Sequence, residues 1–140
     1  METKTRFTHA IVVKGQIWRE GRLLILKRDP GDTLYPGLWD VPGGSLEIGE
    51  TAEQGLKREA LEEAGLAISK IRPLTTWSYG AGDQFEVGIS FRATSLSSEI
   101  TLSDEHTAFA WITPDEIARY AFPSNLAKEI NWLVSKGWHL

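Results

Sequence analysis

The first third of the chain carries a residue pattern typical of β-strands. Residues 7–18 are rich in β-branched and aromatic side chains and are interrupted by Gly15, which predicts one strand or two. A Glu-Gly turn signal follows at residues 20–21, and the mostly apolar run 22–28 predicts a buried strand, so together they indicate a β-hairpin. Residues 29–44 hold too many glycines and prolines for a helix and predict a loop.

Capping signals and periodicity predict helices in the rest of the chain. Thr51 with Gln54 three residues later forms a capping-box pattern, and Gly65 supplies a C-terminal stop. Between them, the i, i+4 spacing puts alanines and a leucine on one face of a helix over 52–64. The other predicted elements are strands near 69–79, 84–96 and 108–112, a short helix from Pro114, and a last helix that Ser124-Asn125 can cap. The order of elements predicts one α/β domain over residues 1–140, a mixed sheet with helices packed on it.

Composition excludes several chemistries. The 140 residues include no cysteine, so disulfides, thiolate zinc sites and a cysteine nucleophile are impossible. The hydrophobic fraction of 41% is that of an ordinary folded protein and not of a disordered chain. The longest apolar runs are far too short to span a membrane, and the polar N-terminus does not resemble a signal peptide. We therefore expect a soluble, cytoplasmic protein with no membrane partner.

The net charge of −4 is concentrated in one short segment. Residues 44–66 contain six glutamates against only Lys57 and Arg58, whereas the other 117 residues hold 13 basic and 13 acidic side chains. The absence of a basic excess argues against a nucleic-acid polymer as partner. The acidic segment instead indicates a local patch that attracts cations.

Three of these glutamates lie on adjacent rows of the predicted helix. Glu59 and Glu63 point within about 40° of each other, and Glu62 lies one step around. Two interpretations stay open here: a solvated acidic helix edge, or a site for Mg²⁺, with Mn²⁺ as a possible substitute. The Gly43-Gly44 pair ahead of the helix favours a ligand site, because its backbone can approach a ligand closely and offer a carbonyl. A helix N-terminus also favours phosphate.

The same segment resembles the signature of the Nudix hydrolase family. That signature is Gly, five residues, Glu, seven residues, Arg-Glu, an apolar residue, any residue, Glu-Glu, any residue, Gly and an apolar residue. The matching positions are Gly44, Glu50, Arg58, Glu59, Ala60, Glu62, Glu63, Gly65 and Leu66. Ala60 is smaller than the aliphatic residue that is usual there. The resemblance implies an α/β/α sandwich with a mixed sheet between helices.

The resemblance also implies an activity, a cofactor and ligands. The activity is Mg²⁺-dependent hydrolysis of a nucleoside diphosphate linked to another group, at a phosphoanhydride. The implied metal ligands are Glu59, Glu62, Glu63 and the Gly43 carbonyl, with Glu50 reaching the metal directly or through water. Arg58 would orient the glutamates by ion pairing.

The general base in this family is a glutamate of the signature or an acid on a later loop. Residues 103–106 resemble that loop, and Glu105 is the favoured base or extra ligand unless the segment is a plain exposed turn. His106 is open to either a structural or a functional role, and Glu86 is a second choice for the base. The catalytic candidates are therefore Arg58, Glu62 and Glu105.

Substrate-binding residues are predicted on the far side of the signature. The candidates for base stacking are Trp77, Tyr79 and Phe85. Asn125 lies in a Phe-Pro…Asn stretch similar to that of MutT-type triphosphatases, where it would read a purine, or else it caps the last helix. Arg28 could meet a phosphate or be a strand-end charge in water.

Elimination favours one substrate class among several. Markers of ADP-ribose, dinucleoside-polyphosphate and coenzyme A enzymes are missing, which leaves a (d)NTP or an oxidised purine NTP as the expected substrate. The alternatives are an ADP-ribose or nucleotide-sugar pyrophosphatase and a non-catalytic module that senses a nucleotide. A homodimer is possible, since members of the family often form one.

Overall fold

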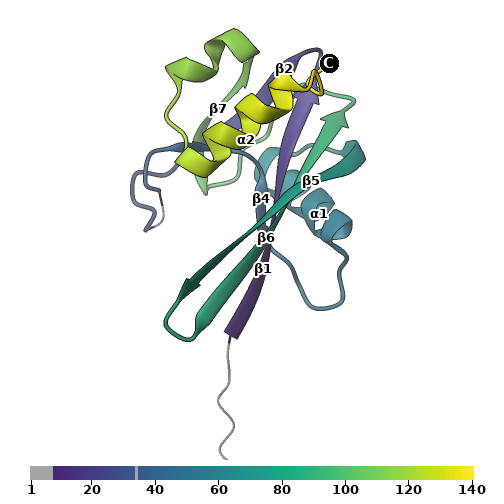
Figure 1. Ribbon diagram of the computed structural model, residues 1–140. Coiled ribbons are helices and arrows are strands. Elements are labelled where there is room, and N and C mark those ends of the chain that lie inside the picture. The colour runs from purple at the N-terminus through teal and green to yellow at the C-terminus, as the bar shows by residue number, and fades with distance from the viewer. Residues whose placement is uncertain (1–7, 34) are drawn as a thin grey trace, which may run out of the picture.

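The computed structural model describes residues 8–33 and 35–140, and it forms a mixed β-sheet flanked by helices (Figure 1). Phe7, the start of the first predicted strand, lies outside the described residues. The elements are β1 (Thr8–Arg19), β2 (Arg22–Arg28), β3 (Trp39–Asp40), β4 (Gly43–Ser45), α1 (Ala52–Ala64), β5 (Ile68–Ala81), β6 (Gln84–Ser95), β7 (His106–Ile112), the 3₁₀ helix η1 (Pro114–Arg119) and α2 (Ser124–Ser135).

The strands of the described residues form one seven-stranded sheet. Its main path runs β3-β2-β1-β6-β5, with β4 also paired to β1 and β7 to β2. The β1–β6 pair is parallel, and the other five strand pairs of the described residues are antiparallel, which makes the sheet mixed. In Figure 1 the ends of β1, β5 and β6 extend past the helices as a long twisted ribbon.

Two apolar cores lie on opposite faces of the sheet. Alternation along β2 shows this directly, because Leu24 and Leu26 belong to one core and Leu23 and Ile25 to the other. The first core includes the buried face of α1, and the second includes the buried stripe of α2. The expected α/β/α arrangement is therefore the one observed.

Most predicted elements are confirmed with close boundaries, including the helix over 52–64 and the strand over 22–28. The first strand differs, because Gly15 does not interrupt it. A Cβ at Gly15 would lie 2.8 Å from Leu56 Cδ1, so this glycine lets α1 pack closely on the strand. The glycine thus reflects close packing of a helix on the sheet and not a break in the strand.

Two local predictions are corrected by the structure, and the short helix predicted from Pro114 is confirmed. The loop predicted over 29–44 contains the short strands β3 and β4, whose pairing with β2 and β1 overrides the low strand propensity of glycine. The short helix from Pro114 is a 3₁₀ helix. Asn125 does not cap the last helix, because Pro123 occupies the cap position and the cap has no side-chain hydrogen bond.

No helix within residues 8–33 and 35–140 has the length and apolar character needed to cross a bilayer.

The packing of α1 on β1 gives a stability prediction. Leu56 is fully buried beneath Gly15, so we expect Leu56→Ala to lower the free energy of unfolding by about 2–5 kcal/mol through lost burial and a residual cavity. Leu61 lies on the same helix with 55% of its surface exposed, and Leu61→Ala should change stability by about 0.5 kcal/mol or less. Urea unfolding of both variants measures this, and equal losses would contradict the packing described.

Candidate active site

Helix α1 carries most of the candidate residues and is fixed at both ends by its sequence. The Thr51 side chain accepts a hydrogen bond from the Gln54 backbone at 3.1 Å, and the Gln54 side chain accepts one from the Thr51 backbone at 2.9 Å. At the other end Gly65 adopts the left-handed conformation and closes the helix. The capping box and the glycine stop therefore set where the helix that carries the glutamates begins and ends.

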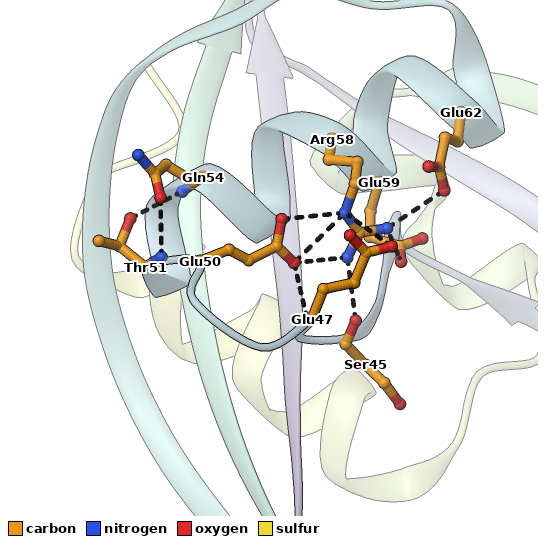
Figure 2. Close-up of polar contacts among 8 residues, drawn as sticks. All are labelled: Ser45, Glu47, Glu50, Thr51, Gln54, Arg58, Glu59 and Glu62. Atoms are coloured by element: carbon orange, nitrogen blue, oxygen red, sulfur yellow. Dashed lines mark hydrogen bonds and ion pairs between the residues drawn. The ribbon is translucent and has the colours of Figure 1, made fainter.

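Arg58 is the centre of an ion-pair cluster at the solvent side of α1 (Figure 2). Its guanidinium donates to Glu50 at 2.7 Å, to Glu59 at 2.8 Å and to Glu62 at 3.2 Å. It also donates to the Ser45 carbonyl at 3.0 Å and lies 3.7 Å from a Glu47 oxygen. One cation thus ties the helix to the loop before it and contacts four of the six glutamates.

This cluster fixes the charge state of two of its members. Hydrogen bonds from the Arg58 side chain and from the Glu47 backbone lower the pKa of Glu50 to about 2. The same contacts, with those to Glu59, raise the pKa of Arg58 above its ordinary value. Glu50 is therefore a carboxylate already engaged by Arg58, which suits a positioning role.

Glu59 and Glu63 point inward from α1, unlike Glu62. Their side chains are 13% and 5% exposed, against 57% for Glu62. Both lie against the glycine pair: the Gly43 N–H donates to Glu63 at 3.3 Å, and a Cβ at Gly44 would lie 2.6 Å from Glu59 Oε1. The glycines therefore leave the space in which two buried carboxylates meet the backbone of β4.

The Glu63 carboxyl is electrostatically unfavourable as an anion in this position. Burial raises its pKa well above the ordinary value of 4.5, the adjacent Glu59 raises it further, and Lys14 opposes the shift only in part. A divalent cation would stabilise the two carboxylates together, and their hard oxygen atoms suit Mg²⁺.

The described residues offer two neighbouring carboxylates and no larger cluster of metal-binding side chains. No group of three or more histidine, aspartate or glutamate side chains among residues 8–33 and 35–140 could hold a metal ion. The Glu59–Glu63 pair fits a cation that takes its remaining ligands from backbone oxygen, water and substrate, as Mg²⁺ commonly does.

The start of β7 and the residue before it supply two further candidates, His106 and Glu105. His106 Nε2 lies 3.7 Å from Glu63 Oε2, and its buried Nδ1 has no hydrogen-bond partner among the described residues. Burial lowers the pKa of His106, which favours the neutral imidazole. Glu105 beside it is exposed and lines the cavity described next, where Glu86 is also found.

A cavity of about 940 Å³ extends from Glu63 across the sheet to α2, and Glu59 is not among the residues that line it. The predicted residues that line it are Arg28, Gly43, Glu63, Trp77, Tyr79, Glu105 and Asn125. The strand pairing gives the width of the sheet beneath the cavity. One row of paired residues crosses β5, β6, β1 and β4 and consists of Trp77, Gly88, Val12 and Ser45. Three strand spacings of about 4.8 Å each separate the two ends of that row, or about 14 Å in all.

The Trp77 indole lies over a glycine of the neighbouring strand. A Cβ at the facing Gly88 would overlap the Trp77 ring, so the glycine allows the indole to lie over β6. Tyr79 is two residues along the same strand and 66% exposed. Phe85 is not among the residues that line the cavity, and it packs against His9 with ring centroids 5.9 Å apart. The structure thus brings two of the three predicted aromatic residues to the cavity.

Arg28 lines the cavity but is engaged by acidic side chains. Its guanidinium donates to Asp40 at 3.1 Å and lies 3.5 Å from Asp32. Lys14 also donates to Asp40, at 2.7 Å. Burial raises the pKa of Asp40, but Lys14 and Arg28 outweigh it and lower the pKa overall.

Sequence reasoning missed Lys14, Asp40, Ser90 and Glu129, which all lie in or beside this cavity. Lys14 has a detectable signal, because strand alternation places it on the face opposite the buried Val13. Glu129 and Ser90 lie 39 positions apart in the chain, and no sequence spacing could have paired them.

Comparisons with known proteins agree with this geometry. A NUDIX domain model matches residues 8–133. A protein of Escherichia fergusonii named nucleoside triphosphatase NudI is 33% identical over 115 residues, which cover 74% of this chain and 82% of that protein. A MutT-like protein of Streptomyces ambofaciens is 37% identical over 111 residues, covering 79% of this chain and 68% of that protein.

Solved structures share the fold. The MutT protein from Methanosarcina mazei Go1 has a TM-score of 0.79 and 22% identity, covering 96% of this chain and 99% of its own. A MutT NUDIX hydrolase from Burkholderia pseudomallei has a TM-score of 0.71 and 26% identity, covering 87% and 97%. With the domain match spanning nearly the whole chain, this protein belongs to the Nudix hydrolase family.

Proposed function

We propose that this enzyme hydrolyses a nucleoside triphosphate to the nucleoside monophosphate and pyrophosphate, with Mg²⁺ as cofactor. The observation that carries the proposal is the continuity of one cavity, which is lined at one end by the buried carboxyl of Glu63 and at the other by the aromatic side chains of Trp77 and Tyr79. A nucleotide has the same division into an anionic part that needs cations and a flat base that stacks. The relative of Escherichia fergusonii named nucleoside triphosphatase NudI supports this substrate class.

The metal end of the site would be formed by Glu59 and Glu63 with the Gly43 carbonyl, and Glu62 would reach it from its exposed position. When bound, Mg²⁺ offsets charge on the polyphosphate and makes the attacking water more acidic. Arg58 would hold Glu50 and Glu59 in place, since it donates to both. The ion pair between Glu62 and Arg58 is exposed to solvent and therefore contributes little stability. Glu62 can leave Arg58, from which it lies 3.2 Å away, at a low cost in free energy.

Glu105 is the proposed general base. Its carboxylate lines the cavity from an exposed loop next to His106, which itself approaches Glu63. A base at this place would accept the proton from the attacking water as the phosphoanhydride bond breaks. The base end of the substrate would lie against Trp77 and Tyr79, with Asn125 at the start of α2 facing the same space.

Glutamine substitution tests the carboxylate pair. We expect Glu63→Gln, which removes a proposed carboxylate ligand of the metal at constant volume, to lower Mg²⁺-dependent pyrophosphate release at least 100-fold, because a metal ion contributes several kcal/mol to the transition state. Glu53→Gln changes an exposed glutamate on the same helix and should retain activity within twofold. The assay is pyrophosphate release from a dNTP panel at fixed Mg²⁺, and equal activity of Glu63→Gln and wild type would refute the metal assignment.

Alanine substitution tests the stacking surface. Trp77→Ala should raise KM about tenfold with a smaller effect on kcat, because stacking of a base on an aromatic ring contributes about 1–3 kcal/mol. Phe85→Ala is the matched control on the same hairpin, since Phe85 does not line the cavity. Steady-state kinetics on the preferred triphosphate separate the two variants, and a larger KM effect in Phe85→Ala would place the base elsewhere.

The substrate class is tested by a wider panel. dNTPs, 8-oxo-dGTP, ADP-ribose and nucleotide sugars are compared at fixed Mg²⁺, with product analysis to locate the broken bond. A triphosphate should have the highest kcat/KM. A strong preference for ADP-ribose would overturn the proposed substrate and leave the family assignment unchanged.

A further inference from the structure

A buried carboxyl–hydroxyl pair joins α2 to the sheet within the cavity. Ser90 on β6 is 1% exposed and donates a hydrogen bond from its Oγ to Oε1 of Glu129 on α2. Glu129 is partly buried and lines the cavity. Within residues 8–33 and 35–140, Glu129 forms no ion pair with a cationic side chain. Neither residue has a part in the metal site.

Strand register places this pair away from the glutamates of α1. Ser90 pairs with Lys14, and Lys14 pairs with Gly43, so Ser90 lies two strand spacings, or about 10 Å, from the backbone that contacts Glu63. Trp77 pairs with Gly88, which lies two residues from Ser90 on β6 and therefore on the same face of the sheet. Glu129 is also one helical turn from Asn125. The pair therefore belongs to the aromatic end of the cavity.

The contacts of Glu129 leave it one acceptor for a ligand. A carboxylate accepts hydrogen bonds and donates none, and Ser90 engages only one of its two oxygen atoms. Burial raises the pKa of Glu129, against the opposing effect of the hydrogen bond from Ser90. An N–H donor from the ligand would satisfy the second oxygen, whereas a carbonyl oxygen facing it would be repelled.

We propose that Glu129, positioned by Ser90, selects nucleobases that present an exocyclic amino group over those that present a carbonyl or a hydrogen at the same position. The inference deepens the proposed function, because it takes the cavity to be the nucleotide site. The amino group of cytosine, adenine or guanine donates to the free carboxyl oxygen, and its replacement leaves that oxygen without a partner. Glu129 acts here as a specificity-determining residue and takes no part in bond breaking.

Matched substrate pairs test the proposal. In the pairs dCTP/dUTP and dATP/dITP a carbonyl oxygen replaces the exocyclic amino group and the adjacent ring nitrogen gains a proton, and in dGTP/dITP a hydrogen replaces the amino group. Together the three pairs show which base supplies the donor. In at least one pair, wild type should favour the amino member in kcat/KM by about tenfold or more, the factor expected of a hydrogen bond to a charged group. Glu129→Met removes the acceptor at similar length and should bring that ratio close to one.

Two further variants serve as control and support. Glu99→Met makes the same change at an exposed carboxylate that does not line the cavity, and it should leave the ratio within twofold of wild type. Ser90→Ala removes the group that fixes Glu129 and should lower the ratio at least threefold. The proposal is overturned if wild type has no preference in any pair, or if both Glu129→Met and Ser90→Ala keep the wild-type ratio.

Binding measurements keep the inference separate from the proposed function. Calorimetric dissociation constants for dCMP against dUMP, and for AMP against IMP and GMP, need no bond cleavage. Triphosphate hydrolysis without base preference would refute the role of Glu129 while the function stands. Absence of hydrolysis, together with a preference in binding that Glu129→Met removes, would refute the function and support the role of Glu129.

Discussion

The constraint on which the rest of the structure depends is the crowding of glutamates around α1, with one guanidinium among them. Arg58 contacts Glu47, Glu50, Glu59 and Glu62, and it holds the pKa of Glu50 far below its ordinary range. Glu63 receives no such contact and is buried beside Glu59, so its pKa shifts the other way. The glutamates that contact Arg58 are therefore compensated, whereas Glu63 is not, and Glu63 is the carboxyl group that a cation would stabilise most.

The backbone of β4 lies against Glu59 and Glu63. Gly43 donates to Glu63, and the absence of a side chain at Gly44 leaves room for the Glu59 carboxylate. The strand that carries both glycines pairs with β1, and β1 pairs in parallel with β6. The carboxylate pair is thereby coupled through the sheet to the surface where Trp77 and Glu129 lie. Rigid strand spacing sets the distance between the anion-binding and base-binding ends of the cavity.

Local signals were sufficient for much of the fold. The capping box at Thr51 and the stop at Gly65 predicted α1, because both motifs act within a few residues. The break predicted at Gly15 was wrong, because the glycine is explained by close packing against Leu56, which is distant in the sequence. Strands β3 and β4 were not predicted, because they are stabilised by pairing with strands elsewhere in the chain. In the site, helical periodicity put Glu59 and Glu63 together, whereas the Ser90–Glu129 contact depends on how α2 crosses the sheet.

The most direct test is the free energy of unfolding of wild type and Glu63→Gln between pH 5 and pH 9, with and without Mg²⁺. Because the folded pKa of Glu63 lies above its ordinary value of 4.5, the folded state binds more protons than the unfolded state. Without metal, wild-type stability should fall relative to that of the variant as pH rises through this window. Mg²⁺ should then stabilise wild type and have little effect on Glu63→Gln. Equal pH dependence of the two proteins, with equal stabilisation by Mg²⁺, would contradict the account.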